Sequence, residues 1–355
     1  MQRYTPLKIF HYTDKLDALP RETGRVEAPV HVRLKPTNQC NHACAYCAYR
    51  SKALQLGRDM RLADSLPRRK MREIVDDLVD MGVGAVTFSG GGEPFVYPHL
   101  AEAADRLAAG GVRIASLTNG GRLAGEAADV FARRGTWLRV SMDGFDGPSY
   151  ARYRGVAEDE FDRVLGNIRR FAALGGPCRL GVSYVVDRGN AHKVRDMAAR
   201  LKDLGVDSFK VSPCVVADDA AANNAYHEPL FALVRPAVDA ILETLAGDGF
   251  EVFDAYHAFS GRFAKRYSWC PSLQLLAVIG ADQRVYACQD KAYNRRCGLL
   301  GSIRRRRFKE FWLDGKDKFF AIDPSRDCPH HCVAQAKNEL VLGYLGADPQ
   351  HLPFV

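Results

Sequence analysis

The chain has 355 residues, of which 47% are hydrophobic and 26% charged, with a formal net charge of +8. This length allows about two domains, the composition is that of an ordinary globular protein, and no stretch approaches the ~18 apolar residues of a membrane span. The concentrated basic run Arg304–Arg307 indicates a solvated helix start or a rim that attracts anions. No nucleic-acid-binding motif accompanies it, so nucleic acid is not an expected partner, whereas a small anionic substrate fits the charge.

The first residues contain no apolar signal-peptide core, which predicts a cytoplasmic protein. Residues 1–29 are polar and interrupted by proline, and we expect them to form an extension that wraps the first domain. The chain carries ten cysteines. Without a secretion signal, so many cysteines indicate metal binding or catalysis in a reducing compartment rather than disulfides.

From residue 30, short β-type runs alternate with amphipathic helical runs. The predicted strands are 30–36, 85–89, 113–118, 137–141, 180–186 and 208–212. Apolar residues follow helical spacing over 71–79, 161–172 and 194–201. Six β–α units in series predict a parallel sheet with helices outside it. The fold expected over 30–225 is therefore a partial (β/α)6 TIM-like barrel, in which the chemistry lies where the strands end.

The pattern changes after the barrel. Residues 226–262 are expected to form a linking helix, with helical signals from about 228 to 247. Apolar runs at 275–279 and 285–288 then predict a hairpin that turns at 281–284. A short helix is expected around 308–313, and we place a second, cysteine-rich domain at 263–355.

Three cysteines follow the first predicted strand with the spacing C-x3-C-x2-C, at Cys40, Cys44 and Cys47. Thiolates select iron–sulfur clusters, zinc or Cu(I). Three protein ligands on a four-coordinate metal leave one position open, which is typical of a catalytic site. A structural zinc loop is the alternative reading, but such loops normally use four cysteines. The dense spacing therefore favours an iron–sulfur cluster.

With Tyr46 just before its last cysteine, this run resembles that of the radical S-adenosylmethionine (radical SAM) enzymes, and the resemblance extends from residue 30 onward. It implies that the three cysteines hold a [4Fe–4S] cluster whose open iron binds the amino and carboxylate groups of SAM, with Tyr46 near the adenine. Residues 91–94, Gly-Gly-Glu-Pro, resemble the element that binds the methionyl amino group. Glycines allow close backbone approach, and the Glu93 carboxylate would offset an ammonium.

Further motifs stand at strand ends. Residues 140–144 occupy the place where related enzymes hold the ribose hydroxyls, which implies contacts from Ser141 and Asp143. Asn119, after the third strand, is a further candidate for SAM binding. Tyr153-Arg154-Gly155 is similar to the branch that modifies peptides and sugars.

The second domain resembles the SPASM/twitch extension, which carries auxiliary iron–sulfur clusters. Its C-x(9–15)-G-x4-C element is nearly present between Cys270 and Cys288, with Gln283 in place of the turn glycine. A non-glycine residue there would need a positive φ, at modest cost. Five cysteines suffice for one auxiliary [4Fe–4S] cluster, the half-SPASM or twitch pattern. The ligands assigned by this resemblance are Cys270, Cys288, Cys328 and Cys332.

Two alternatives remain for this cluster. Cys297 is left over and could replace one of the four assigned ligands, whereas His330 and His331 are expected beside the ligands rather than among them. A four-cysteine zinc site is the rival to the cluster itself, although the seventeen residues between Cys270 and Cys288 are a poor zinc-knuckle spacing.

The resemblance also implies a reaction. One electron, from a donor such as flavodoxin or ferredoxin, enters SAM, and a 5′-deoxyadenosyl radical then takes a hydrogen from a substrate carbon, while the protein supplies position and electrostatics. An auxiliary cluster that accepts an electron from the substrate radical gives alcohol oxidation. A thiol that returns a hydrogen gives epimerisation instead, and Cys214, after the sixth strand, is placed for that role. The alternative is that Cys214 is simply a small buried residue.

Only 29 residues precede the first strand, fewer than peptide-maturing relatives often use to bind a precursor, so a small carbohydrate, aminocyclitol or sugar-nucleotide substrate is expected. Residues predicted to reach it are Tyr97, Arg154, Tyr184, Lys210, Gln289 and Asp290. Arg154 and Lys210 are the candidates to stabilise a developing oxyanion, unless they are ordinary exposed charges. The alternative functions are maturation of a ribosomally made peptide and a non-catalytic role as an iron–sulfur electron carrier or sensor.

Overall fold

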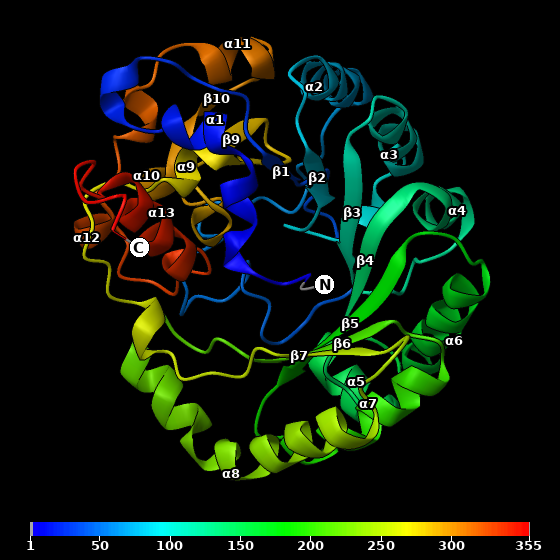
Figure 1. Ribbon diagram of the computed structural model, residues 1–355. Coiled ribbons are helices and arrows are strands. Elements are labelled where there is room, and N and C mark those ends of the chain that lie inside the picture. Colours follow the sequence, from blue (N-terminus) through cyan, green and yellow to red (C-terminus); the bar gives the residue numbers. More distant parts are fainter. Residues whose placement is uncertain (1–2, 355) are drawn as a thin grey trace.

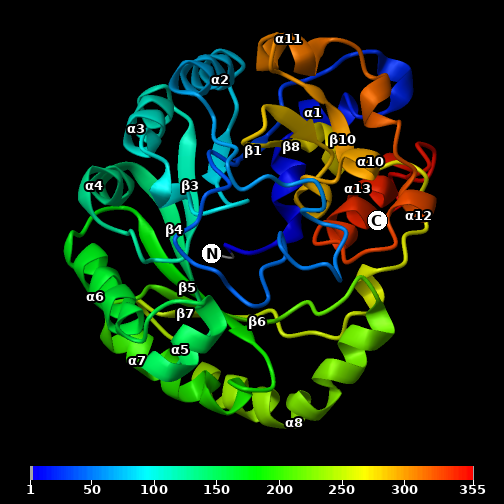
Figure 2. The ribbon, with the colours of Figure 1, turned by 180° about the vertical axis from the view of Figure 1, so that it is seen from behind.

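A single curved sheet of ten strands runs through the protein, and the helices that follow its parallel strands lie mainly on the outer side of the curve (Figures 1 and 2). The computed structural model describes residues 3–354. The strand order is β10-β9-β8-β1-β2-β3-β4-β5-β6-β7. Strands β1 to β6 are His31–Leu34, Ala85–Phe88, Arg113–Thr118, Gly135–Met142, Arg179–Val186 and Ser208–Pro213.

These six strands are parallel neighbours in chain order, which confirms the six predicted strands and the TIM-like α/β arrangement. Alternate side chains on each strand face the helices and form one large core, for example Val32 and Leu34 on β1 and Val182 and Val186 on β5. The helices that cover this outer face are α2 (Arg68–Asp80), α3 (Leu100–Ala109), α4 (Gly125–Arg134), α5 (Gly147–Arg154), α6 (Asp159–Ala173) and α7 (Val194–Asp203).

Beyond β6 the chain forms a long helix, α8 (Ala220–Thr244), and a short strand, β7 (Glu251–Asp254), which pairs in parallel with β6. The helix begins six residues before the predicted linking segment, and β7 extends the barrel sheet by a strand that was not predicted. The parallel sheet therefore continues past the six predicted units.

The C-terminal strands extend the same sheet beyond β1, at the edge opposite β7. Strand β8 (Leu276–Ile279) pairs in parallel with β1, and β9 (Arg284–Tyr286) pairs antiparallel with β8, which confirms the predicted hairpin. Gln283 in its turn has φ of 61°, as expected for the position of the missing glycine. The remaining elements are β10 (Leu299–Ser302), α9 (Ser272–Leu275), α10 (Arg295–Gly298), α11 (Phe308–Leu313), α12 (Pro324–Asp327) and α13 (Gln335–Leu345).

The N-terminal segment packs on the C-terminal part of the chain. Ile9 and Leu16, the latter in α1 (Thr13–Asp17), share a small core with Leu275 and with Val341 of α13. The two ends of the described chain are therefore held together by apolar contacts. Within residues 3–354, no helix has the length and apolar character needed to cross a membrane.

Candidate active site

The loop that carries Cys40, Cys44 and Cys47 follows β1 and is fixed to the helices beside it. The backbone amides of Ala43 and Ala45 donate to the carbonyl groups of Arg154 and Tyr153 at 2.8 and 2.9 Å. These two bonds tie the middle of the loop to the last turn of α5. The loop is thus held by α5, the first helix after β4.

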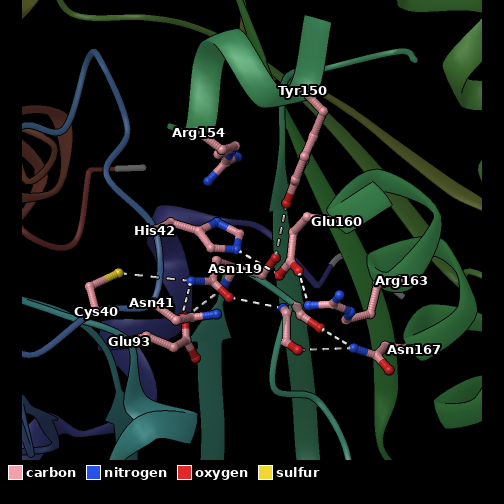
Figure 3. Close-up of polar contacts among 12 residues, drawn as sticks. Cys40, Asn41, His42, Glu93, Asn119, Tyr150, Arg154, Glu160, Arg163 and Asn167 are labelled. Atoms are coloured by element: carbon pink, nitrogen blue, oxygen red, sulfur yellow. Dashed lines mark hydrogen bonds and ion pairs between the residues drawn. The ribbon is translucent and has the colours of Figure 1, made fainter. Parts of the chain in front are cut away.

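A buried pair, His42 and Glu160, makes a second attachment. The His42 Nε2 atom lies 3.0 Å from Glu160 Oε1, and Glu160 also accepts a hydrogen bond from Arg163 at 2.6 Å (Figure 3). Burial lowers the pKa of His42, so its imidazole favours the neutral form that donates one N–H to the carboxylate. The loop is therefore fixed to α6 from its interior side.

Two of the three cysteine sulfurs are close to polar hydrogen donors. Asn119 Nδ2 lies 3.8 Å from Cys40 Sγ, and Arg154 Nη1 lies 3.7 Å from Cys44 Sγ. All three thiols are free and half-buried. An amide and a guanidinium directed at thiolates stabilise their negative charge and orient them, as groups around a bound cluster do. This donor set fits a cluster ligated by three thiolates.

Among residues 3–354, no three His, Cys, Asp or Glu side chains are close enough together to hold a single metal ion. In a four-iron cluster, each thiolate binds a separate iron, so the sulfurs need not converge on one point.

Glu93 is the centre of a buried polar group at the ends of β2 and β3. Its carboxylate accepts hydrogen bonds from the Thr118 hydroxyl at 2.7 Å, the Asn119 amide at 2.7 Å and the Phe95 amide at 3.0 Å. Asn119 in turn donates to Asn41 Oδ1 at 2.9 Å (Figure 3). The acid of the Gly-Gly-Glu-Pro element therefore links the third strand to the cysteine loop. Its contact with a methionyl ammonium stays a prediction.

The glycines of this element allow the cysteine loop to approach. A Cβ atom added at Gly92 would overlap the Gln39 carbonyl, and one added at Gly91 would overlap the Asn38 side chain. The Glu93 amide donates to the Gln39 carbonyl at 2.9 Å. No other residue type fits at these positions without moving the loop.

Arg154 joins the predicted ribose-binding residues to the cysteine loop. It is 3% exposed, and its guanidinium donates to Asp143 Oδ1 at 2.8 Å and to the Ser141 carbonyl at 2.8 Å. Burial alone would lower the pKa of Arg154, but the adjacent Asp143 carboxylate, together with Tyr150 and Cys44, raises it above its usual value. Within residues 3–354, the second carboxylate oxygen of Asp143 is buried without a hydrogen-bond partner, and so is the Tyr46 hydroxyl.

Two residues expected to reach a substrate do not face the rim. Tyr97 and Tyr184 belong to the large core between sheet and helices, and the Tyr97 hydroxyl donates to the Leu66 carbonyl at 2.9 Å. Tyr184 shares its face of β5 with Val182 and Val186, whereas Ser183 and Val185 alternate with it on the other face. The prediction was wrong for both tyrosines.

The predicted auxiliary ligands lie close together in the C-terminal part. Burial, together with the nearby thiols of Cys332 and Cys328, raises the pKa of Cys270 to about 12. The pKa of Cys288 is raised well above its usual value by burial, by Asp290 and by the thiols of the other three cysteines. The four cysteines thus form one cluster of side chains drawn from the start of α9, the end of β9 and the loop after α12.

Cys297 makes a different contact. Its sulfur lies 3.4 Å from Gln55 Oε1, whereas the Cys270 sulfur accepts from Asn338 Nδ2 at 3.2 Å.

Two buried lysines, Lys265 and Lys291, donate to backbone carbonyls beside the assigned ligands, at His330 and Asp327 respectively. Their positive charges suit a group of four thiolates.

Cys214 follows β6 and is 6% exposed. Its sulfur lies 3.7 Å from His227 Nε2, and the same nitrogen is 2.9 Å from the Cys214 carbonyl oxygen, while His227 Nδ1 lies 2.7 Å from the Tyr256 hydroxyl. Because Nε2 donates to the carbonyl, it does not deprotonate the thiol. Burial raises the pKa of Cys214 to about 12, so the sulfur keeps its hydrogen. His227 and Tyr256 were not predicted, because they are far from Cys214 in sequence.

Comparison with known proteins adds independent evidence. Residues 34–199 match the family model of the radical SAM superfamily. This stretch, a little under half of the chain, is similar to the radical SAM superfamily. It contains the cysteine loop, Glu93, Asn119 and Arg154.

Curated relatives differ in what they act on. This chain is 26% identical over 183 residues to the antilisterial bacteriocin subtilosin biosynthesis protein AlbA of Bacillus subtilis (strain 168), covering 51% of this chain and 38% of that protein. It is 28% identical over 190 residues to the dTDP-4-amino-4,6-dideoxy-D-glucose ammonia-lyase of Streptomyces venezuelae, covering 50% and 36%. The matches thus span well under half the length of these relatives.

Solved structures share the fold over most of the chain. Streptococcus suis SuiB bound to its precursor peptide SuiA has a TM-score of 0.64 at 14% identity, covering 90% of this chain and 72% of that one. Native anSMEcpe with bound AdoMet has a TM-score of 0.59 at 16% identity, covering 89% and 96%. At these identities the likeness concerns the fold alone.

Proposed function

We propose that this protein uses SAM to abstract a hydrogen atom from a carbon of a small, polar, carbohydrate-like substrate. The observation that carries the proposal is the cysteine loop, whose sulfurs face Asn119 and Arg154 at the end of the parallel sheet. When bound, the cluster and SAM supply the 5′-deoxyadenosyl radical. The chain holds the cluster through Cys40, Cys44 and Cys47.

Other residues would orient the SAM molecule. Backbone groups at residues 90–92 would receive its methionyl end, and Ser141 and Asp143, both fixed by Arg154, would receive the ribose. The unpartnered Tyr46 hydroxyl stands beside the last cysteine, where the adenine would lie. Arg154 holds Ser141 and Asp143 in place, and backbone hydrogen bonds from Gly92 and Glu93 hold the glycine element, which lowers the cost of positioning SAM.

We propose further that Cys270, Cys288, Cys328 and Cys332 hold an auxiliary [4Fe–4S] cluster. Two observations support this assignment. The thiols of these cysteines raise one another's pKa, and two buried lysines, Lys265 and Lys291, lie beside them. A four-thiolate cluster leaves no open iron and therefore suits electron transfer.

The fate of the substrate radical decides the product. An auxiliary cluster held by the four C-terminal cysteines would supply an acceptor for the substrate electron, so that an alcohol would become a ketone with loss of its hydroxyl proton. If Cys214 donates its hydrogen atom, the carbon is epimerised, and the sulfur radical would recover its hydrogen with one electron from the flavodoxin- or ferredoxin-like donor and one proton from solvent. The buried, protonated state of Cys214 supports the second outcome. Lys210, in the middle of β6, stays a candidate to stabilise an oxyanion.

Two substrate classes have support among the relatives. Similarity to an ammonia-lyase of a dTDP-linked sugar favours a carbohydrate or sugar nucleotide. Similarity to AlbA, a bacteriocin biosynthesis protein, favours maturation of a peptide as the second candidate.

The test is anaerobic reduction of the reconstituted protein with dithionite in the presence of SAM. Formation of 5′-deoxyadenosine in the wild type, and its loss in Cys44→Ala, is the expected result. Absence of SAM cleavage in a protein that contains its full iron would instead support an electron carrier or sensor. In D2O, incorporation of one deuterium that Cys214→Ala abolishes would identify epimerisation, whereas a ketone product would identify oxidation.

A further inference from the structure

Three cations stand on the inner face of the barrel sheet. They come from strands that are not neighbours: Arg33 from β1, Arg139 from β4 and Lys210 from β6. The residues on either side of each cation belong to the core between sheet and helices, so strand alternation turns the cations to the opposite face. All three side chains are half-buried and therefore remain open to solvent or a ligand.

Their charges are not neutralised by carboxylates. Within residues 3–354, the Arg33 and Lys210 side chains make no hydrogen bond or ion pair. Arg139 contacts the Tyr4 hydroxyl, but its Nε atom is buried without a partner. Burial, followed by the charges of Arg139, Arg33 and Arg262, lowers the pKa of Lys210 to about 8. Like charges on one face that act on each other in this way are unfavourable unless an anion joins them.

One carboxylate does influence this group. The charge of Asp290 favours the charged form of Arg33, but Asp290 itself accepts a hydrogen bond from the Val333 amide at 3.1 Å. No ion pair between Asp290 and Arg33 forms in the described part of the chain. The inner face thus keeps an excess of positive charge after Asp290 is counted.

The cations lie close to the predicted SAM-binding rim. Lys210 is in register with Ser183 of β5, which is in register with Ser141 of β4. Arg139 precedes Ser141 by two residues on the same face of β4, and is therefore one step farther from the rim. A ligand bound to these cations would present its remaining atoms toward the cysteine loop.

We propose that Arg33, Arg139 and Lys210 bind a phosphate-bearing group of the substrate on the inner face of the sheet. This inference rests on the proposed function, and it narrows the carbohydrate class to phosphorylated sugars or sugar nucleotides. Three cations match a group with more than one negative charge, and guanidinium groups bind phosphate oxygens in pairs. Binding of the anion would set how far the substrate enters the barrel, so that its reacting carbon faces the rim.

The test is calorimetric titration of the reconstituted holoenzyme with sodium pyrophosphate at low ionic strength. Arg33→Met and Lys210→Met should each weaken binding by about tenfold or more, the effect of one lost charge-assisted contact. Arg134→Met, which removes an exposed arginine from the outer helix α4, is the matched control and should bind as the wild type does. Lys210→Arg, which keeps the charge, should retain most of the affinity and guards against a simple folding defect.

Several outcomes would overturn the inference: no binding of pyrophosphate by the wild type, an equal loss in Arg134→Met, or binding of succinate as tight as that of pyrophosphate. Formation of 5′-deoxyadenosine is measured on the same samples. SAM cleavage without pyrophosphate binding would reject this inference and leave the proposed function standing. Pyrophosphate binding that depends on Lys210, in a fully loaded protein that never cleaves SAM, would support the anion site and reject the proposed function.

Discussion

Replacement of Arg154 by methionine should destabilise the protein strongly. Arg154 and Asp143 are 3% and 1% exposed, and the guanidinium is 2.8 Å from the carboxylate and 2.8 Å from the Ser141 carbonyl. Without Arg154, Asp143 is left as a buried charge without its cation, which costs about 3–5 kcal/mol of unfolding free energy. With a urea m-value of about 3 kcal/mol/M, the unfolding midpoint should fall by about 1 M or more.

The assay is urea unfolding of the reconstituted protein, followed anaerobically by far-UV circular dichroism. Arg154→Met, Asp143→Leu and the double variant form a cycle, in which the double variant should recover a large part of the loss because no charge remains buried. Arg152→Met, an exposed position on the same helix, should stay within about 0.5 kcal/mol of the wild type. A single variant Arg154→Met within about 1 kcal/mol of the wild type, or additive losses in the cycle, would refute the reasoning.

Three other variants test the site. Cys332→Ala should lower the iron content from about eight to about four per chain, whereas Cys297→Ala should leave it unchanged; the reverse pattern would move Cys297 into the ligand set. Gly92→Ala should cost about 1–3 kcal/mol by overpacking and weaken SAM binding measured by equilibrium dialysis, whereas Gly343→Ala, with open space around it, should not. Tyr97→Phe should cost about 1 kcal/mol in urea unfolding through its lost hydrogen bond and leave SAM cleavage intact; reduced SAM cleavage would return Tyr97 to the active site.

The strands and most helices of the barrel could be predicted because their signals are local. Alternating or periodic apolar residues mark each element, and the six predicted strands differ from the observed ones by two residues or fewer at either end. Strand β7 was missed because its four residues, Glu251–Asp254, include two acids and no buried side chain. The pairing of β8 with β1 joins residues about 245 positions apart, and no local pattern encodes such a contact.

The same distinction holds in the site. The cysteine run, Glu93 and Asn119 form short motifs at strand ends, and the structure brings them together. The His42–Glu160 pair spans 118 positions and involves common residue types, so the sequence contains no signal for it. Tyr184 was misplaced because the phase of alternation along β5 was not followed, although Val182 and Val186 define its face. Arg33 and Lys210 carried a usable signal, since each is a charge between apolar neighbours in a strand.

The direct pairing of β8 with β1 also bears on electron transfer. The Cys40–Cys47 loop leaves the end of β1, and Cys288 follows β9, two strands away in the same hydrogen-bonded ladder. The spacing between the two groups of cysteines is therefore set by backbone geometry and not by a flexible hinge between domains. If both groups hold clusters, the tunnelling distance between them is a constant of the sheet, and the rate of electron exchange should not depend on whether a substrate is bound.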